Sequence, residues 1–268
     1  MSFKFESVYF DNPIVPGRAM DIFLPEVLSQ DDAIFFVHGG GWAAGARDHF
    51  HKLMRAFNAE GFVCASTDYR LRPSGATILD QVADIRDGYK LFLERLAELG
   101  RPRRVFVIGS SAGAHLAALL AFAAPGACGE PTDYRPDIAW VPPSGAALQA
   151  TPVSFEPWED IFPHGWTSMR EIVGAPYETA PELYRKVSPR EHLSPHTCPT
   201  FFLEAENEHM FPSSMVIEVV EKLKALGVQA EYKVYTKAEH GFFYDLPRRQ
   251  QQEAFADILA FIARRRGA

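Results

Sequence analysis

The chain has 268 residues, of which 47% are hydrophobic and 23% charged. This balance is typical of a globular protein and excludes disordered, collagen-like and coiled-coil chains. Its 27 basic and 34 acidic residues give a net charge of −7. Nucleic-acid-binding proteins usually carry a basic excess, and docking on an anionic membrane also needs basic clusters. Neither kind of partner is therefore expected. A chain of this length buries roughly three quarters of its surface, so residues 1–268 are expected to form one domain.

The three cysteines, Cys64, Cys128 and Cys198, are odd in number and form no CxxC pair. They predict neither a disulfide framework nor a zinc site. The first ten residues lack the basic region and apolar run of a secretory signal. No apolar stretch reaches the roughly 18 residues of a membrane-spanning helix. These features predict a cytoplasmic protein.

Apolar stretches of strand length alternate along the chain with amphipathic stretches of helix length. Such alternation predicts an α/β fold, with a mostly parallel eight-stranded sheet and helices on both faces. The first two strands flank a turn-rich segment and are expected to pair antiparallel. The expected strands are residues 4–10, 18–24, 33–38, 62–68, 104–109, 138–141, 200–205 and 230–236, and the expected helices are residues 47–60, 77–99, 112–124, 213–226 and 248–266.

Residues 145–190 are rich in proline and aromatic residues and show no regular pattern. We expect them to form a lid-like insertion over one end of the sheet. In open α/β sheets, ligands bind beyond the carboxyl ends of the strands. The residues that directly follow strands are therefore the candidates for a functional site.

Residues 109–113 (GSSAG) join an expected strand to an expected helix and fit the G-x-S-x-G pattern of a nucleophile elbow. The small flanking residues allow a sharp turn that exposes the side chain of Ser111. That side chain would also lie at a helix N-terminus, whose partial positive charge favours an anionic intermediate. The alternative is an ordinary Gly/Ser turn, but the position between strand and helix favours a nucleophile.

Residues 38–42 (HGGGW) follow another expected strand. Glycine amides at such a position can donate hydrogen bonds to a developing oxyanion, and one such donor contributes about 3 kcal/mol to transition-state stabilisation. The alternative is a phosphate-binding loop. However, the stretch lacks the Lys-Ser/Thr ending of a P-loop and the spacing of a dinucleotide fingerprint.

His240 follows the last expected strand and is the candidate general base, because histidine titrates near neutral pH. An acid that orients this histidine should follow the strand 200–205. Glu204, Glu206 and Glu208 all qualify by position. Glu208 lies farthest into the loop and is preferred, with Glu206 as the alternative. The order serine, acid, histidine is that of the α/β-hydrolases.

With these motifs in place, the sequence resembles the α/β-hydrolase superfamily, in particular its hormone-sensitive-lipase-like and bacterial feruloyl/acetyl esterase branch. The matching motifs are HGGGW at 38–42, DYRL at 68–71, GSSAGAHLA at 109–117 and EHGF at 239–242. The resemblance implies an α/β-hydrolase fold, with Ser111 as nucleophile and His240 as base. It further implies an oxyanion hole formed by the amides of Gly40, Gly41 and Ala112.

The family acid usually stands in a G-x-x-D-x-x-x-P pattern, which here reads AENEHMFP over residues 205–212. The pattern again selects Glu208, although glutamate replaces aspartate and Ala205 replaces glycine. Ser110 stands where the lipase-like branch often has aspartate. This difference favours the feruloyl/acetyl esterase-like branch.

Aromatic residues cluster within the 145–190 segment, and another follows the glycine motif. They are predicted to bind the acyl or aryl part of a substrate. Two alternatives are equally well supported for the cluster: a loop anchored by buried aromatics, or a contact within a homodimer. The predicted substrate-binding residues are Trp42, Phe155, Trp158, Phe162 and Trp166.

The predicted activity is hydrolysis of a small-molecule carboxylic ester, without metal or organic cofactor. The histidine pairs 49/51 and 192/196 have no evident third partner, so no metal site is expected. The same residues would also serve an amidase, an aryl-formamidase or an acyl transferase. A non-catalytic binding protein on a hydrolase scaffold is the remaining alternative.

Overall fold

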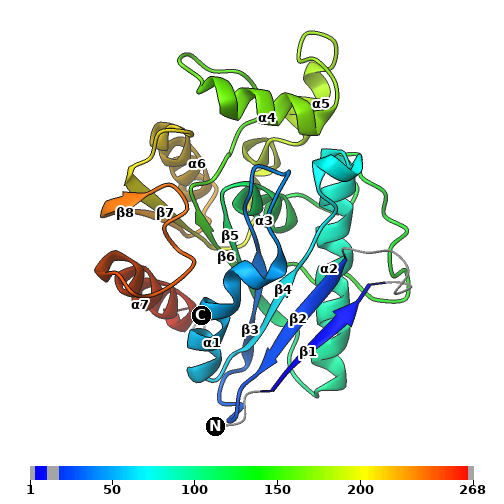
Figure 1. Cartoon of the computed structure of the whole chain (residues 1–268), viewed down its shortest axis with the longest axis vertical. Coiled ribbons are helices and arrows are strands. Elements are labelled where there is room, and N and C mark those ends of the chain that lie inside the picture. The colour runs from blue at the N-terminus through cyan, green and yellow to red at the C-terminus, as the bar shows by residue number, and fades with distance from the viewer. Residues whose placement is uncertain (1–3, 11–17, 265–268) are drawn as a thin grey trace.

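A computed structural model describes residues 4–10 and 18–264 of the chain. At its centre is an eight-stranded sheet in the order β1-β2-β4-β3-β5-β6-β7-β8 (Figure 1). The pairs β1–β2 and β2–β4 are antiparallel, and the other pairs are parallel. The predicted α/β fold class is confirmed. The strands are β1 (Lys4–Tyr9), β2 (Ala19–Leu24), β3 (Asp32–Val37), β4 (Val63–Thr67), β5 (Arg104–Ser110), β6 (Gly145–Gln149), β7 (Thr200–Asn207) and β8 (Ala230–Glu239).

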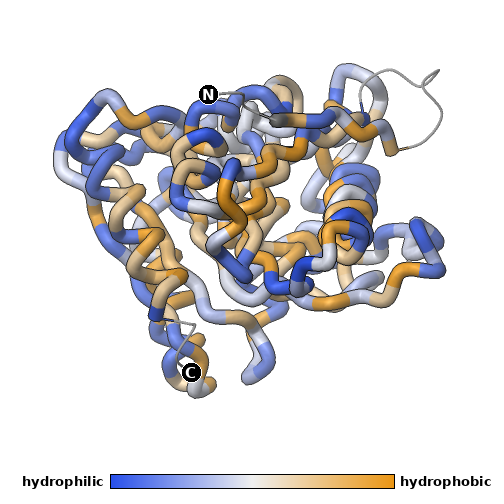
Figure 2. Tube along the Cα trace, turned by 90° about the horizontal axis from the view of Figure 1, so that it is seen from below, coloured by the Kyte–Doolittle hydropathy of each residue, from blue (hydrophilic) through white to orange (hydrophobic). Residues whose placement is uncertain are grey.

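Helices cover both faces of the sheet and bury apolar side chains against it, and the helix at Ala112–Phe122 is buried on all sides. Helices α2, α3 and α6 pack into one buried cluster, and helices α1 and α7 pack into a second cluster on the opposite face. Hydrophobic segments gather toward the middle of the molecule, while the outer helices alternate between hydrophobic and hydrophilic residues (Figure 2). The helices are α1 (His51–Ala59), α2 (Ile78–Glu98), α3 (Ala112–Phe122), α4 (Pro163–Val173), α5 (Pro181–Lys186), α6 (Ser213–Ala225) and α7 (Arg249–Arg264).

Two predictions fall partly on residues that the structure does not describe. The turn expected between the first two strands lies at residues 11–17, and the expected end of the last helix includes residues 265 and 266. Both lie outside the described residues. None of the helices within residues 4–10 and 18–264 combines the length and hydropathy that are needed to cross a membrane.

The strand predicted at residues 138–141 is wrong: this segment is irregular and partly exposed, and Trp140 packs beside Tyr89 instead. The sixth strand is β6, whose residues are all buried between β5 and β7. Its sequence GAALQ contains small residues where β-branched ones are typical of strands. Small size is nevertheless required, because a Cβ at Gly145 would lie 2.5 Å from the ring of Phe106.

The segment 145–190 is also more regular than predicted, since it contains β6 and the helices α4 and α5. Proline stands at the start of both helices, at Pro163 and Pro181, and Gly174 ends α4 in the left-handed conformation. These are ordinary helix-start and helix-end signals. The two helices lie together at one end of the molecule, beyond the sheet (Figure 1).

A buried arginine that is ion-paired with a glutamate holds the end of helix α3 against helix α2. Arg86 of α2 and Glu130 are both fully buried, with 2.7 Å between Nε and Oε1. Arg86 Nη2 also donates to the carbonyl oxygens of Leu119 and Ala123 at 3.3 and 2.9 Å. Ala123 is the C-cap at which α3 ends, and its amide also donates to the carbonyl oxygen of Leu119 at 3.1 Å. The helix that begins directly after Ser111 is thus fixed at its far end.

Candidate active site

Ser111 lies in a sharp turn between β5 and α3. Its backbone has φ 55° and ψ −122°, a conformation that side-chain-bearing residues adopt only under strain. The turn requires strand, helix and the neighbouring strand to approach closely. A Cβ at Gly113 would lie 2.1 Å from the carbonyl oxygen of Val37 in β3. The sequence thus folds into the predicted elbow.

The side chains of Ser111, His240 and Glu208 form one hydrogen-bonded chain. His240 Nε2 lies 2.8 Å from Ser111 Oγ, and His240 Nδ1 lies 2.8 Å from Glu208 Oε2. Because a carboxylate only accepts, the Nδ1 proton donates to Glu208, and Nε2 accepts from the serine hydroxyl. Three segments that are far apart in the sequence meet here, as predicted. The arrangement can remove a proton from Ser111 and hold it on His240.

The environment of Glu208 favours its charged form. Burial by itself would raise the pKa of this carboxyl, but the hydrogen bond and charge of His240, together with two backbone amides, lower the pKa overall. The amides of Met210 and Phe211 donate to Glu208 Oε1 at 2.8 and 3.4 Å. Such hydrogen bonds stabilise a carboxylate over the neutral acid. The charged form of Glu208 is therefore favoured beside the imidazole of His240.

The structure separates the three candidate acids. Glu206 is exposed, and its Oε2 accepts from the amide of Lys237 at 2.8 Å. Glu204 points into the core from β7 and is 1% exposed. Of the three carboxylates, it is Glu208 that bonds to His240. The preference for the residue farthest into the loop agrees with this geometry.

The glycine-rich turn at residues 39–41 lies beside Ser111. A Cβ at Gly39 would be 3.3 Å from Ser111 Cβ. Gly40 has φ +125°, and a Cβ there would lie 2.1 Å from the carbonyl oxygen of Ala44, so the turn needs glycine at this position. Among the described residues, the amides of Gly40 and Gly41 donate to no protein group. The amide of Ala112 is in the first turn of α3 and has no acceptor within the helix.

Two residues beside the elbow were not predicted from the sequence. The hydroxyl of Tyr244 accepts from the amide of Gly39 at 3.0 Å. The backbone oxygen of Gln149 accepts from the amide of Ser111 at 2.9 Å, and its side chain accepts from Ser110 Oγ at 2.6 Å. Both contacts depend on the packing of distant segments. The position of Gln149 at the end of β6 would have been a signal, had that strand been found.

The structure places two of the five predicted substrate-binding aromatics in the core. Trp42 and Phe155 are 2% and 0% exposed. Their ring centroids lie 5.2 Å apart, and Phe155 stacks on His115 at 4.3 Å. Both rings are therefore packed in the core beneath the site, in contrast to the prediction that Trp42 and Phe155 contact the substrate.

The other three aromatics occupy different positions in the segment after β6. Trp166 packs on Tyr177 and Tyr184, with centroid distances of 6.1 and 5.7 Å, and thereby anchors α4 to α5. Phe162 is 44% exposed at the start of α4. Trp158 is linked to the site by ring contacts: its ring centroid lies 6.4 Å from that of Phe211, which lies 6.0 Å from that of His240. The alternative of an aromatic-anchored loop thus describes Phe155 and Trp166.

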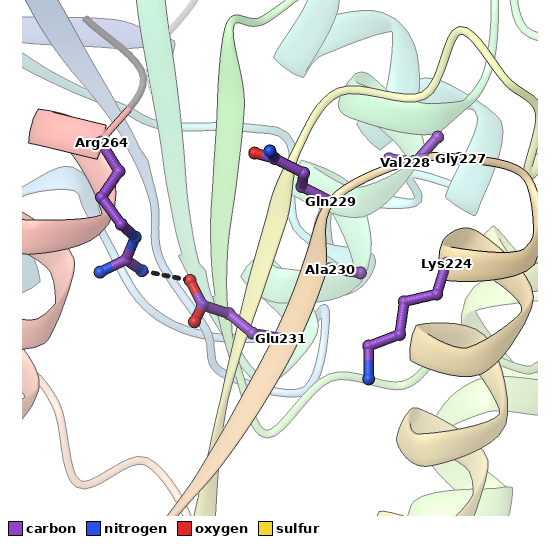
Figure 3. A pocket seen from close by; sticks show the side chains of 7 residues that line it. All are labelled: Lys224, Gly227, Val228, Gln229, Ala230, Glu231 and Arg264. Carbon is purple, nitrogen blue, oxygen red and sulfur yellow. Dashed lines mark hydrogen bonds and ion pairs between the residues drawn. The ribbon is translucent and has the colours of Figure 1, made fainter. Parts of the chain in front are cut away.

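A cavity of about 640 Å³ opens near the beginning of β8 (Figure 3). Lys224 and the ion-paired Arg264 and Glu231 line it. His240 follows the opposite end of the same strand. The cavity is therefore separate from the candidate active site.

The sheet order, the elbow after β5 and the histidine after β8 define the chain as an α/β-hydrolase. The BD-FAE family model matches residues 20–223. Because this range is most of the chain, the protein belongs to the BD-FAE family.

Individual relatives agree with this classification. The chain is 27% identical to the isoprenylcysteine alpha-carbonyl methylesterase ICME of Arabidopsis thaliana, over 95% of this chain and 61% of that protein. It is 27% identical to esterase LipQ of Mycobacterium tuberculosis, over 87% of this chain and 56% of that protein. The chain thus spans only part of the length of these relatives.

Among solved structures, the propionate-bound esterase Est2 of Thermogutta terrifontis superposes with a TM-score of 0.80 at 23% identity, covering 97% of this chain and 93% of that one. At 23% identity, this similarity shows that the two chains share a fold.

Glu204 generates a prediction about stability. Burial, together with the charge of Glu208, raises the pKa of Glu204 to about 8, and its Oε1 has no hydrogen-bond partner among the described residues. In the unfolded chain the pKa of glutamate is about 4.3. Between these values the folded state binds more protons than the unfolded state, so its stability falls as pH rises.

We therefore expect Glu204→Gln to raise the melting temperature relative to wild type, by an amount that grows between pH 5 and pH 9. Each kcal/mol corresponds to about 2–4 °C for a chain of this size. Thermal unfolding at four or more pH values measures the difference. Glu206→Gln, which changes an exposed carboxyl on the same strand, is the matched control, and its difference from wild type at pH 9 should be smaller than that of Glu204→Gln. Parallel curves for wild type and Glu204→Gln would contradict the prediction.

Proposed function

We propose that the protein is a serine carboxylesterase that cleaves small esters through Ser111, His240 and Glu208. The observation that carries the proposal is the hydrogen-bonded chain from Glu208 through His240 to Ser111. Beside it lie glycine amides that have no acceptor in the part of the chain that the structure describes. A nucleophile, a base and oxyanion donors are the three elements that acyl transfer through a serine needs.

In the proposed reaction, Ser111 Oγ attacks the ester carbonyl carbon while His240 Nε2 takes the hydroxyl proton. The carbonyl oxygen becomes an oxyanion, which accepts hydrogen bonds from the amides of Gly40, Gly41 and Ala112. His240 then protonates the departing alkoxide, and the alcohol leaves an acyl-enzyme. Water repeats the sequence on that acyl group and releases the acid. Glu208 stays ionised throughout and stabilises the imidazolium.

The relatives support ester chemistry. ICME is named a methylesterase, and LipQ is named an esterase. The Thermogutta esterase has been described with propionate and with butyrate bound, and phosphorylated by paraoxon. We therefore propose short acyl groups as the first substrates to assay. The segment after β6 would form one wall of the acyl or alcohol site, with Trp158 and the exposed Phe162 toward the substrate.

Ser111→Ala removes the nucleophile and is expected to lower kcat/KM for 4-nitrophenyl butyrate by at least about 10⁴-fold. Ser74→Ala, which changes an exposed turn hydroxyl bonded to Leu71, should stay within twofold of wild type. Steady-state hydrolysis followed at 400 nm measures both variants. A Ser111→Ala rate within tenfold of wild type would exclude the mechanism.

The assignment of the acid can be tested with two isosteric changes. Glu208→Gln keeps the size of the side chain but removes the charge that holds the imidazole in the correct tautomer, and kcat should fall by about 10³–10⁴-fold. Glu206→Gln should change kcat by less than threefold. The kcat for 4-nitrophenyl butyrate at pH 8 decides between them. A larger loss in Glu206→Gln than in Glu208→Gln would reverse the assignment.

A further inference from the structure

Trp42 directly follows the glycine turn and has an unusual backbone. Its φ is 60°, in the left-handed region, and Gly41 before it has φ 59°. A bulky residue in this conformation is strained and persists only where its surroundings hold it. The conformation of Trp42 sets the direction in which the chain leaves Gly41. What holds Trp42 therefore bears on the position of the oxyanion donors.

The indole of Trp42 is held by His115, which lies on α3 one turn after Ser111. Trp42 Nε1 donates to His115 Nδ1 at 3.3 Å, and His115 Nε2 lies 2.7 Å from the carbonyl oxygen of Val187. Because the carbonyl oxygen of Val187 can only accept and the indole N–H can only donate, one tautomer of His115 satisfies both: Nε2 carries the proton, and Nδ1 accepts. Burial lowers the pKa of His115 to about 3, so the ring stays neutral. His115 is thus a fixed acceptor for the indole.

The other end of Trp42 is held as well. Its carbonyl oxygen accepts from Gln81 Nε2 at 2.8 Å and from the amide of Arg72 at 3.0 Å. Phe155 covers the imidazole face of His115 and the edge of Trp42. Backbone and side chain of Trp42 are therefore fixed from opposite sides. Of these contacts, the bond to His115 joins the glycine turn to the helix that carries the nucleophile.

We propose that His115 is a positioning residue for the reaction: by accepting the indole N–H of Trp42, it holds the left-handed turn at residues 41–42, so that the amides of Gly40 and Gly41 face the developing oxyanion. The inference rests on the proposed esterase function and adds a residue to it. Ser111 is the N-cap of the helix that carries His115, and its carbonyl oxygen accepts from the amide of His115 at 3.0 Å, so donors and nucleophile share one rigid support. A displacement of about 1 Å between them can cost about 10²-fold in rate.

Two amide substitutions separate this role from a merely structural one. In His115→Asn the side-chain oxygen can replace Nδ1 as acceptor for Trp42, but the side chain is too short for Val187. In His115→Gln the amide nitrogen can replace Nε2 as donor to Val187, but no acceptor remains at the position of Nδ1. We expect His115→Asn to keep kcat for 4-nitrophenyl butyrate within threefold of wild type, and His115→Gln to lose tenfold or more with KM within twofold.

Trp42→Phe removes the donor while keeping an aromatic ring, and it should lose tenfold or more in kcat. Trp140→Phe is the matched control, because Trp140 packs on Tyr89 and Arg86, away from the glycine turn; its kcat should equal that of wild type. The affinity for an aryl trifluoromethyl ketone, which forms a tetrahedral adduct with an oxyanion, should fall in parallel with kcat. Folding of each variant is checked by its melting temperature.

The proposal is overturned if His115→Gln keeps kcat while His115→Asn loses it, since the bond to Val187 would then be the one that matters. It is also overturned if Trp42→Phe has wild-type kcat, and this variant decides the question if both His115 variants fail to fold. Failure of the esterase function itself would look different: wild type would hydrolyse the ester no faster than Ser111→Ala, and both proposals would fall.

Discussion

The site depends on the steric constraint at Ser111. A residue with φ 55° and ψ −122° between β5 and α3 is strained, and the strain is held because both neighbouring elements are packed into the core. Close contact of Gly113 with β3 brings the helix against the sheet. The buried Arg86–Glu130 pair fixes the other end of that helix. The position of the serine hydroxyl relative to His240 depends on this turn.

Around that turn, the fold distinguishes groups of the same chemistry by their environment. Glu204 and Glu208 lie four residues apart, yet the pKa of Glu204 is raised by burial, and that of Glu208 is lowered by its hydrogen bonds. Two histidines also differ in their contacts: His115 is buried between the rings of Trp42 and Phe155 and bonds to the carbonyl oxygen of Val187, whereas His240 lies part-buried between Glu208 and Ser111. Position in the fold, more than residue type, decides which group is suited to move a proton.

The sequence predicted the features that are encoded locally. The elbow at residues 109–113 and the glycine motif at 38–42 are short motifs with a steric reason for each small residue, and the strands before them are continuous apolar runs. The strand β6 was misplaced because its small residues serve packing against β5 rather than the usual β-propensity. Helices α4 and α5 were not predicted, because the high content of aromatic residues and proline in residues 145–190 favoured an irregular segment, although helix-start and helix-end signals were present.

The long-range contacts of the site could not be predicted from the sequence. The bonds of Tyr244 to Gly39 and of His115 to Trp42 join residues that are 205 and 73 positions apart, and no local pattern marks them. The sequence favoured Glu208 but left Glu206 as an alternative for the same reason, since the choice depends on which side chain reaches His240. The aromatic residues were predicted as one group, but tertiary packing divides them between the core, the anchoring of α4 and the neighbourhood of His240.

The central claim is that Ser111 is activated by His240 in the folded protein. Labelling with a fluorophosphonate, followed by peptide mass spectrometry, tests this claim most directly, because it reports the modified residue without knowledge of the substrate. The account predicts a single adduct on Ser111, formed at least about 10²-fold more slowly in His240→Ala. No adduct in folded protein, an adduct on another residue, or equal rates in wild type and His240→Ala would contradict it.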